Sequence, residues 1–89
     1  MAWTVELDRA ALRDLDKLGR QAARRILSFL RDRIATLDDP RSIGEALKGP
    51  ALGEFWRYRV GDYRVISRIE DAASRVLVLK IGHRRSVYR

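Results

Sequence analysis

The chain has 89 residues and a formal net charge of +7, from 19 Lys and Arg against 12 Asp and Glu. It contains no cysteine and one histidine, His83, which leaves no material for a disulfide framework or for a Cys or His metal site. We see no signal-peptide pattern and no apolar run near the roughly 20 residues that span a bilayer, so we expect one soluble, cytoplasmic domain without a cofactor.

The first half of the sequence predicts a strand and two helices. Trp3–Leu7 alternates apolar and polar residues, as a half-buried strand does. Asp8 is a suitable N-cap for a short helix that ends at Gly19 and bears Leu12, Leu15 and Leu18. A second helix begins near Arg20, stops at Asp38-Asp39-Pro40, and repeats apolar residues every three or four positions at Ile26, Phe29, Leu30, Ile34 and Leu37.

The second half predicts a loop and three strands. Residues 41–54 are rich in Gly and Pro and are expected to form a loop, with one turn of helix around Ile43–Leu47. Strands are expected at Phe55–Val60, Tyr63–Glu70 and Val76–Ile81. Closely spaced strands pair antiparallel, and a helical hairpin must cover one sheet face to bury both apolar surfaces. We therefore predict an α+β domain of order β-α-α-β-β-β.

Positive charge is concentrated in these strands. Residues 1–54 hold 10 Lys and Arg against 9 Asp and Glu, whereas residues 55–89 hold 9 against 3. Strand alternation places Arg57 and Arg59 on one sheet face and Trp56, Tyr58 and Val60 on the other. Arginine matches phosphate geometry and aromatic rings stack on unpaired bases, so this arrangement favours RNA or single-stranded nucleic acid as a partner.

Three segments together resemble the RelE toxins of the RelE/ParE superfamily, and the resemblance runs almost end to end. They are Leu47-Lys48-Gly49, the block from Phe55 to Ile66 with Arg57-Tyr58-Arg59-Val60-Gly61-Asp62-Tyr63-Arg64, and the close Lys80-Ile81-Gly82-His83-Arg84-Arg85-Ser86-Val87-Tyr88-Arg89. The resemblance implies an endoribonuclease that cuts mRNA in the ribosomal A site. The attack by the ribose 2′-hydroxyl on the adjacent phosphate needs no metal.

The resemblance also implies roles for particular residues. Arg64 and Arg84 would clamp the scissile phosphate as exposed sheet-face arginines, and Tyr88 would stack on a base or transfer a proton, unless it only covers the sheet edge. RNA contacts are expected from Arg57, Arg59, Arg85 and Lys80. The implied partners are the ribosome, mRNA and a RelB-like antitoxin that folds on binding, with operator DNA bound through the antitoxin and no membrane contact.

The general base is left open. Arg57 and Arg59 stand where the best-studied relative has lysines, and arginine does not lose its proton. Glu45 resembles the glutamate base of the YoeB branch, although a solvated loop carboxylate is the simpler explanation. His83 is the other candidate, because histidine as a residue type can exchange a proton near neutral pH. A structural role, in which His83 bonds to the backbone at the end of a strand, is equally consistent. His83 is slightly favoured, because it shares a segment with Arg84 and Tyr88.

Two other functions fit the composition. ParE toxins share the fold and inhibit DNA gyrase by binding it, and a basic module could simply bind ribosomal RNA. The combination of paired strand arginines with the Arg84-Arg85-Ser86-Val87-Tyr88 close favours the ribonuclease, because a toxin that only binds has no need of phosphate clamps.

Overall fold

The computed structural model describes residues 3–47 and 55–85, and its elements follow the predicted order with one added strand. In chain order they are β1 (Thr4–Leu7), α1 (Arg9–Leu18), α2 (Arg20–Phe29), β2 (Glu45–Ala46), β3 (Phe55–Val60), β4 (Tyr63–Glu70) and β5 (Arg75–His83). Within the described ranges, neither helix has the length and apolar character needed to cross a bilayer.

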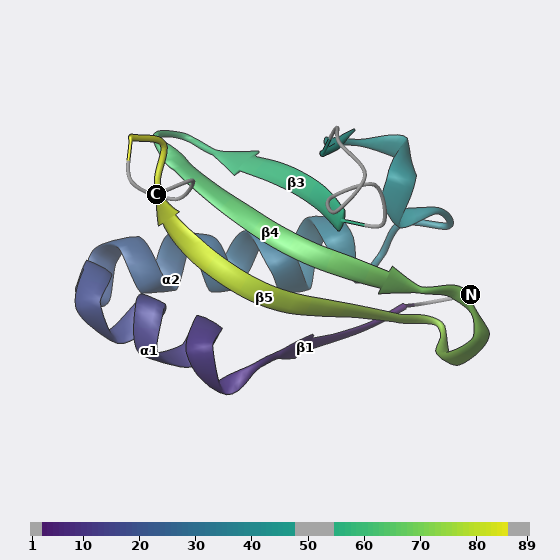
Figure 1. The fold of residues 1–89 in the computed structure, drawn as a ribbon, viewed down its shortest axis with the longest axis horizontal. Helices are drawn as coiled ribbons and strands as arrows, with labels where there is room; N and C mark the ends of the chain where they lie inside the picture. Colours follow the sequence, from purple (N-terminus) through teal and green to yellow (C-terminus); the bar gives the residue numbers. More distant parts are fainter. Residues whose placement is uncertain (1–2, 48–54, 86–89) are drawn as a thin grey trace.

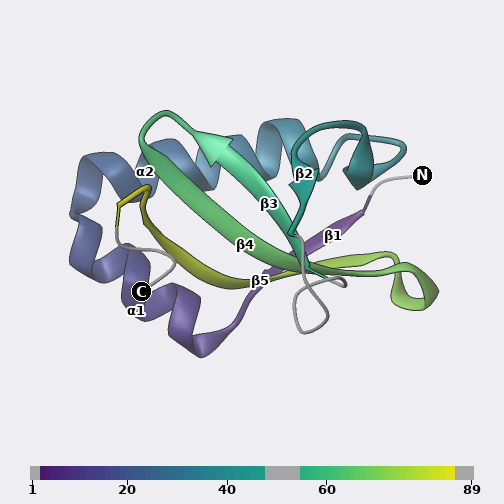
Figure 2. The same ribbon diagram turned by 45° about the horizontal axis from the view of Figure 1, so that its top comes forward.

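The strands form one mixed sheet in the order β1-β5-β4-β3-β2. β1 runs parallel to β5, and the other neighbours pair antiparallel. Figures 1 and 2 show both helices on the same side of this sheet, which leaves its other face free of helices. The predicted α+β class, a helical hairpin on one face of a mainly antiparallel sheet, is therefore confirmed.

Local signals at the helix ends act as the sequence predicts. The Asp8 carboxylate accepts a hydrogen bond from the Ala10 N–H at 3.3 Å, which caps α1. Gly19, with a φ of 91°, ends α1 and starts α2 within one residue. α2 then continues through a π-helical turn, Leu30–Ile34, that keeps both terminal side chains buried.

The core lies between the helices and the sheet face that they cover. Its buried side chains come from both layers: Ala11, Leu15, Ile26, Leu30, Ile34, Tyr58, Val60, Val65, Ile69, Val76, Val78 and Ile81. The Tyr58 hydroxyl donates to the Pro40 carbonyl at 2.7 Å, and burial raises the pKa of Tyr58. This bond fastens the segment after the helices onto β3.

The turn of helix predicted around Ile43–Leu47 is wrong. Glu45 and Ala46 instead pair with Arg57 and Trp56 as the short edge strand β2. Gly44 has a φ of 81° and lies so close to β3 that an added Cβ would sit 2.5 Å from the Arg57 carbonyl oxygen. A backbone partner from a distant segment has overridden the local helix preference of Glu-Ala-Leu.

The last strand is longer than predicted and changes register. β5 extends to His83, and its pairing with β4 shifts between Ile66 and Ser67, where Ile66 faces Lys80 but Ser67 faces Val78. A slip of one residue reverses the faces of every side chain beyond it. It therefore decides which side of the sheet receives Lys80 and His83.

Candidate nucleic-acid interface

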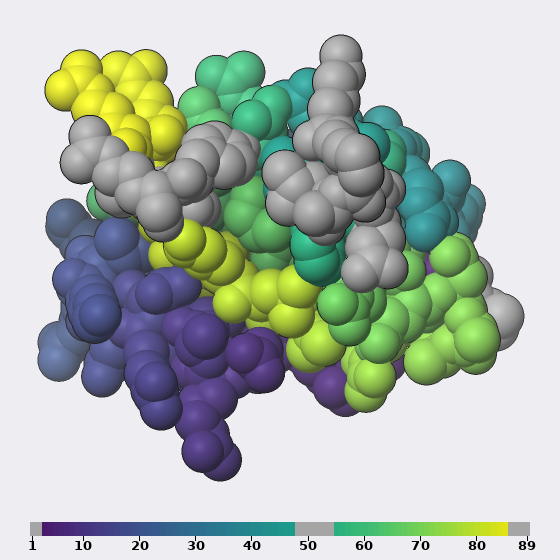
Figure 3. All heavy atoms as spheres, viewed as in Figure 1, coloured from purple at the N-terminus to yellow at the C-terminus, as the bar shows by residue number. Residues whose placement is uncertain are grey.

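The register gathers basic side chains in two neighbouring rows on the helix-free face of the sheet. The first row crosses β2, β3, β4 and β5 and consists of Glu45, Arg57, Ile66 and Lys80. The second row crosses β3, β4 and β5 and consists of Arg59, Arg64 and Gly82. We call these residues the arginine face. Residues opposite each other on paired strands have Cβ atoms about 4.5–5.5 Å apart, so the charges lie close together. In the view of Figure 1, atoms of β4 and β5 on this side reach the surface (Figure 3).

Glu45 supplies a carboxylate to this cationic surface. It forms an ion pair with Arg57, its partner across β2 and β3. The Arg57 side chain is 25% exposed and that of Glu45 is 56% exposed, so the pair lies at the solvent boundary. The bond orients Glu45 toward the arginines, where a carboxylate can accept a proton from a bound hydroxyl.

Arg64 is buried, whereas the sequence analysis predicted an exposed arginine on the sheet face. It is 8% exposed, and its Nη1 donates to the Gly61 and Tyr63 carbonyl oxygens, each at 3.0 Å. Carbonyl acceptors offset the desolvation of a guanidinium, which explains how the charge is accommodated. The same bonds fix the orientation of Arg64 directly opposite the exposed Arg59.

Arg84 meets Arg64 at the same turn of the chain. It lies exposed in the turn after β5, and its backbone N–H donates to the Asp62 carbonyl at 2.8 Å. Residues 61–63 at the β3–β4 turn therefore bond both predicted phosphate clamps. Gly61 and Tyr63 accept from the guanidinium of Arg64, and Asp62 accepts from the backbone N–H of Arg84. Arg85, the next residue, is also exposed.

His83 lies on the opposite side of the sheet from the arginine face. It pairs with Tyr63, and the two rings meet edge to face with centroids 6.1 Å apart. Tyr63 in turn lines a hollow with Gln21, Ala22 and Arg25 of α2, on the helix side. The His83 Nδ1 accepts the backbone N–H of Arg85 at 3.3 Å, as a strand-end histidine bonded to the backbone would.

Lys80 joins the arginine face because of the register shift in β5. Counting alternate residues from the buried Val76 and Val78 would have placed Lys80 under the helices and His83 beside the arginines. The shift exchanges them. Tyr88, the remaining predicted site residue, lies outside the described residues.

One basic residue of this surface was absent from the predicted site. Arg68 belongs to the next outward row, opposite Phe55, with its guanidinium carbon 5.5 Å from the centre of that ring. The spacing Arg64, Ile66, Arg68 along one strand already indicates a shared face. Over residues 3–47 and 55–85, no three His, Asp or Glu side chains converge as metal ligands would.

This arrangement can bind a phosphodiester. The like charges of Arg59 and Arg64 stand opposite each other, which is unfavourable until an anion is bound. Fixed guanidinium groups also stabilise negative charge that develops on a reacting phosphate. The neighbouring Glu45 adds a proton acceptor, so binding and general-base chemistry are both available on one face.

Known proteins with the same pattern identify the family. A family model described as ParE toxin of type II toxin-antitoxin system, parDE, matches residues 5–88. The chain is 32% identical over 89 residues to Toxin RelG of Mycobacterium tuberculosis, covering 100% of this chain and 99% of that protein. It is also 32% identical over 85 residues to Toxin RelE of the same organism, covering 96% of this chain and 84% of that one.

Solved structures agree with this relationship. The toxin–antitoxin complex RelBE2 from M. tuberculosis contains a chain with a TM-score of 0.83 at 26% identity, covering 93% of this chain and 92% of that one. The archaeal RelE–RelB complex from Pyrococcus horikoshii gives 0.71 at 28% identity, with coverage of 97% and 99%. The chain belongs to the RelE/ParE superfamily of toxins from type II toxin–antitoxin systems.

Proposed function

We propose that this toxin is an endoribonuclease that cleaves mRNA in the ribosomal A site. The observation that carries the proposal is the arginine face, where Arg59 and Arg64 lie opposite each other, next to the turn that also bonds the backbone of Arg84, and where a carboxylate lies on the same surface. Two relatives that match most of the chain carry the names RelG and RelE. The reaction is attack of the ribose 2′-oxygen on the adjacent phosphorus, without a metal.

Arg64 and Arg84 stabilise the phosphorane in this mechanism. A fixed donor aimed at developing charge is worth about 10²–10³ in rate, and the two carbonyl bonds to Arg64 provide such fixation. Arg59, which is exposed, attracts and holds the RNA backbone with Arg57, Lys80 and Arg85.

Glu45 is the better-placed candidate for the general base. It shares the arginine face and is oriented by Arg57, whereas His83 lies across the sheet against Tyr63. The 2′-hydroxyl proton passes to Glu45 as the bond from oxygen to phosphorus forms. The bond from phosphorus to the 5′-oxygen then breaks, and that oxygen takes a proton from Tyr88 or water to leave a 2′,3′-cyclic phosphate and a 5′-hydroxyl.

The ribosome completes the site in this proposal. The chain offers few acid or base groups on the arginine face, so correct positioning of the substrate must supply much of the rate. We expect weak cleavage of free RNA and strong cleavage of translated mRNA. A toxin that acts on translating ribosomes would work in the cytoplasm.

A RelB-like antitoxin that folds on binding is the proposed partner. Similar chains of known structure include toxins solved as RelE–RelB or RelBE complexes. An acidic segment that reaches the arginine face would lower the chemical reactivity of Arg57, Arg59 and Arg84 in the complex. The complex would contact its own operator DNA through the antitoxin.

A ParE-like function is the second candidate, because the matching family model is described as a ParE toxin. Such a toxin would inhibit DNA gyrase by binding and would need no aligned phosphate clamps. Expression of the chain would then trigger a DNA-damage response and leave mRNA intact.

The deciding experiment is inducible expression with and without the antitoxin, with mapping of mRNA 5′ ends. Purified protein is then assayed on programmed ribosomes and on naked RNA. Cleavage confined to ribosome-bound message supports the proposal, whereas equal rates on both substrates contradict ribosome dependence. Tyr88→Phe and Tyr88→Ala separate its roles: loss with Phe indicates proton transfer, and loss only with Ala indicates stacking.

A further inference from the structure

The turn between β3 and β4 has an arginine on its helix side as well. Arg25 of α2 lies against Gly61: a Cβ added to that glycine would sit 2.8 Å from Nη2 and 2.9 Å from Nη1 of Arg25. The carbonyl of the same glycine accepts a hydrogen bond from Arg64, which belongs to the arginine face. Two guanidinium groups therefore adjoin one turn residue, and their mutual repulsion is relieved when an anion binds beside them.

Arg25 forms one wall of a hollow beside this turn. The hollow has a volume of about 360 Å³, and Gln21, Ala22 and Tyr63 line it together with Arg25. Gln21 and Arg25 are four residues apart on α2, so an amide and a guanidinium stand next to each other on one stripe of the helix. Both are exposed, whereas Ala22 is buried and adds only a methyl group to the lining. The hollow is thus open to solvent and has N–H donors on its helical wall.

The aromatic wall of the hollow is supported from the sheet. Tyr63 meets the His83 ring edge to face at 6.1 Å, and the His83 Nδ1 accepts from the backbone N–H of Arg85 at 3.3 Å. These contacts give His83 a structural use that the nuclease mechanism does not. They also tie the wall of the hollow to the segment that carries the exposed Arg84 and Arg85.

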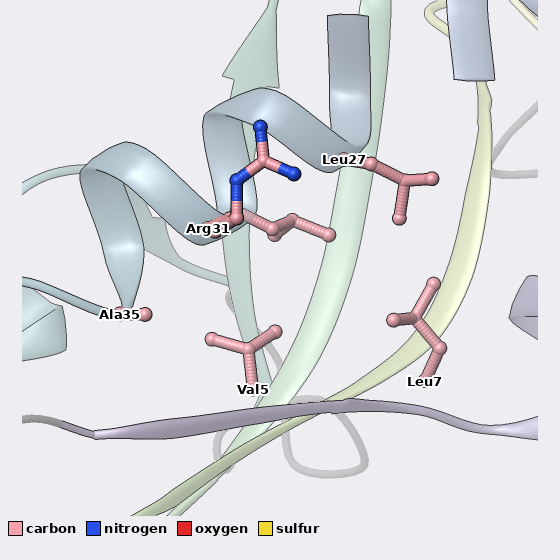
Figure 4. Close-up of a pocket in the computed structure, with 6 residues that line it drawn as sticks. Val5, Leu7, Leu27, Arg31 and Ala35 are labelled. Atoms are coloured by element: carbon pink, nitrogen blue, oxygen red, sulfur yellow. The ribbon is translucent and has the colours of Figure 1, made fainter. Parts of the chain in front are cut away.

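The hollow between β1 and α2 offers an anion much less. Val5, Leu7, Leu27 and Ala35 give it an apolar lining, with Arg31 at its rim (Figure 4). An apolar lining cannot replace the water that an anion loses on binding. In the hollow beside the turn, by contrast, two neighbouring side chains can donate. Neither of them takes part in a hydrogen bond or ion pair within the part of the chain that the structure describes.

We propose that the hollow beside the turn is a second phosphate subsite, in which Arg25 and Gln21 bind the RNA phosphate next to the scissile one. The inference rests on the proposed nuclease function and adds a path for its substrate. The RNA would leave the arginine face over Gly61 and reach α2, instead of continuing along the strands. A guanidinium fork beside an amide suits the oxygens of a phosphodiester. The ring of Tyr63 offers a surface on which the flanking nucleotide packs.

The charge around the turn agrees with this path. Asp62 is the one carboxylate within the Gly61-Asp62 turn, whereas Arg25, Arg64 and Arg84 all adjoin it. The scissile phosphate on the arginine face and its neighbour in the hollow would each meet at least one guanidinium. A phosphate chain crossing the turn therefore finds positive charge on both sides of it.

Arg25→Gln in the full chain tests the subsite by binding. It keeps much of the side chain that covers Gly61 and removes the charge. The probe is a short single-stranded RNA, with Kd measured by fluorescence anisotropy over a range of salt. We expect Kd to rise by about three- to tenfold at low salt, and the slope of log K against log salt to become shallower by about 0.7, the share of one phosphate contact.

Arg24→Gln is the matched control. Arg24 is the preceding residue of α2 and is also exposed, but it lines a different hollow with Leu27 and Arg31. It should keep the salt slope of the wild type. Thermal unfolding of both variants should match wild type, because substitutions at exposed positions have small effects on stability.

A second measurement locates the phosphate that Arg25 binds. Programmed ribosomes carry mRNA with one neutral methylphosphonate linkage, placed in turn at each position beside the scissile phosphate. Arg25→Gln should raise the toxin concentration needed for half-maximal cleavage and leave the single-turnover rate at saturation unchanged, because the contact is made in ground and transition states alike. This effect should vanish for one linkage position only, as in a double-mutant cycle.

The possible failures are distinguishable. Equal losses and equal slopes for Arg24→Gln and Arg25→Gln would mean that charge acts at long range, and would remove the subsite alone. An Arg25 effect that survives every neutral linkage, or that appears in antitoxin affinity and not in RNA affinity, would also overturn it. A wild-type chain that binds RNA with the Arg25-dependent slope but leaves mRNA intact would refute the nuclease and keep the RNA contact. A wild-type chain that neither binds nor cuts RNA would refute both.

Discussion

The two faces of the sheet are built from the same strands but have opposite chemistry. On β3, Tyr58 and Val60 point to the helices and are buried, while Arg57 and Arg59, which alternate with them along the strand, point away. The covered face supplies apolar packing, which is the main source of stability in a domain of this size. The other face sets arginines opposite each other, which lowers stability unless an anion is bound. The contrast teaches that the helix-free face is organised for binding at some expense of stability.

Arg64 does not fit a simple division between packed and solvated faces. It belongs to the binding face, yet it is buried and bonded to the turn that also holds Arg84. The arginine face therefore has a fixed part around this turn and a solvated part around Arg59. Four substitutions test this view, in order of decreasing expected effect.

Glu45→Gln should give the largest loss of cleavage. It keeps the shape of the side chain and removes the proton acceptor, so the single-turnover rate on programmed ribosomes should fall by about 10²–10⁴. His83→Gln is the control on the opposite face and should change the rate little. The reverse result, with His83→Gln inactive and Glu45→Gln active, would mean that the base acts across the sheet edge.

Arg64→Ala should reduce both cleavage and stability. Loss of a fixed phosphate donor should lower the single-turnover rate by about 10²–10³. The Gly61 and Tyr63 carbonyls also lose a buried partner, which should lower the free energy of unfolding by about 1–3 kcal/mol. Rate and urea denaturation are measured on the same preparation. A variant with wild-type activity or wild-type stability would contradict the idea that the turn fixes Arg64 for phosphate binding.

Arg59→Ala should separate function from stability. Cleavage should fall by about tenfold or less and recover partly at low salt, because an exposed arginine acts through phosphate attraction that salt screens. The free energy of unfolding should rise by up to about 1 kcal/mol, since the like charge opposite Arg64 is removed. Salt-dependent RNA binding and denaturation test this; a destabilised variant would argue against strain between the two arginines.

Asp71→Asn should have the smallest effect, because it touches neither face. Asp71 accepts two bonds of 2.9 Å from Arg41, and the guanidinium lowers the pKa of the Asp71 carboxyl. A carboxyl with a lowered folded-state pKa stabilises the protein above its unfolded value near 4 and loses this contribution as the pH falls through the folded value. Thermal unfolding should show a small deficit for the variant at pH 7 that disappears at pH 2. A deficit that persists in acid would exclude the ion pair as its cause.

Much of the fold follows from local patterns along the chain. The Asp8 cap, the break at Gly19 and the strands of the Phe55–Glu70 hairpin each depend on residues within a few positions. Glu45–Ala46 could not be predicted in this way, because its strand exists only where β3 supplies a backbone partner. The burial of Arg64 could not be predicted either: its partners, the Gly61 and Tyr63 carbonyls, are close in sequence, but only the path of the turn brings them within reach of the guanidinium.

The sequence by itself determined the charge of the strands, the alternation of arginines with tyrosines along them and the family to which these motifs belong. Tertiary structure alone decided which groups share a face. A one-residue shift in β5 moved Lys80 toward Arg57 and turned His83 to the helix side, and side-chain alternation along a single strand cannot reveal where such a shift occurs. Likewise, the hollow lined by Val5 and Leu7 of β1 and by Leu27 of α2 exists only because these two elements, which are distant in the chain, lie side by side in the fold.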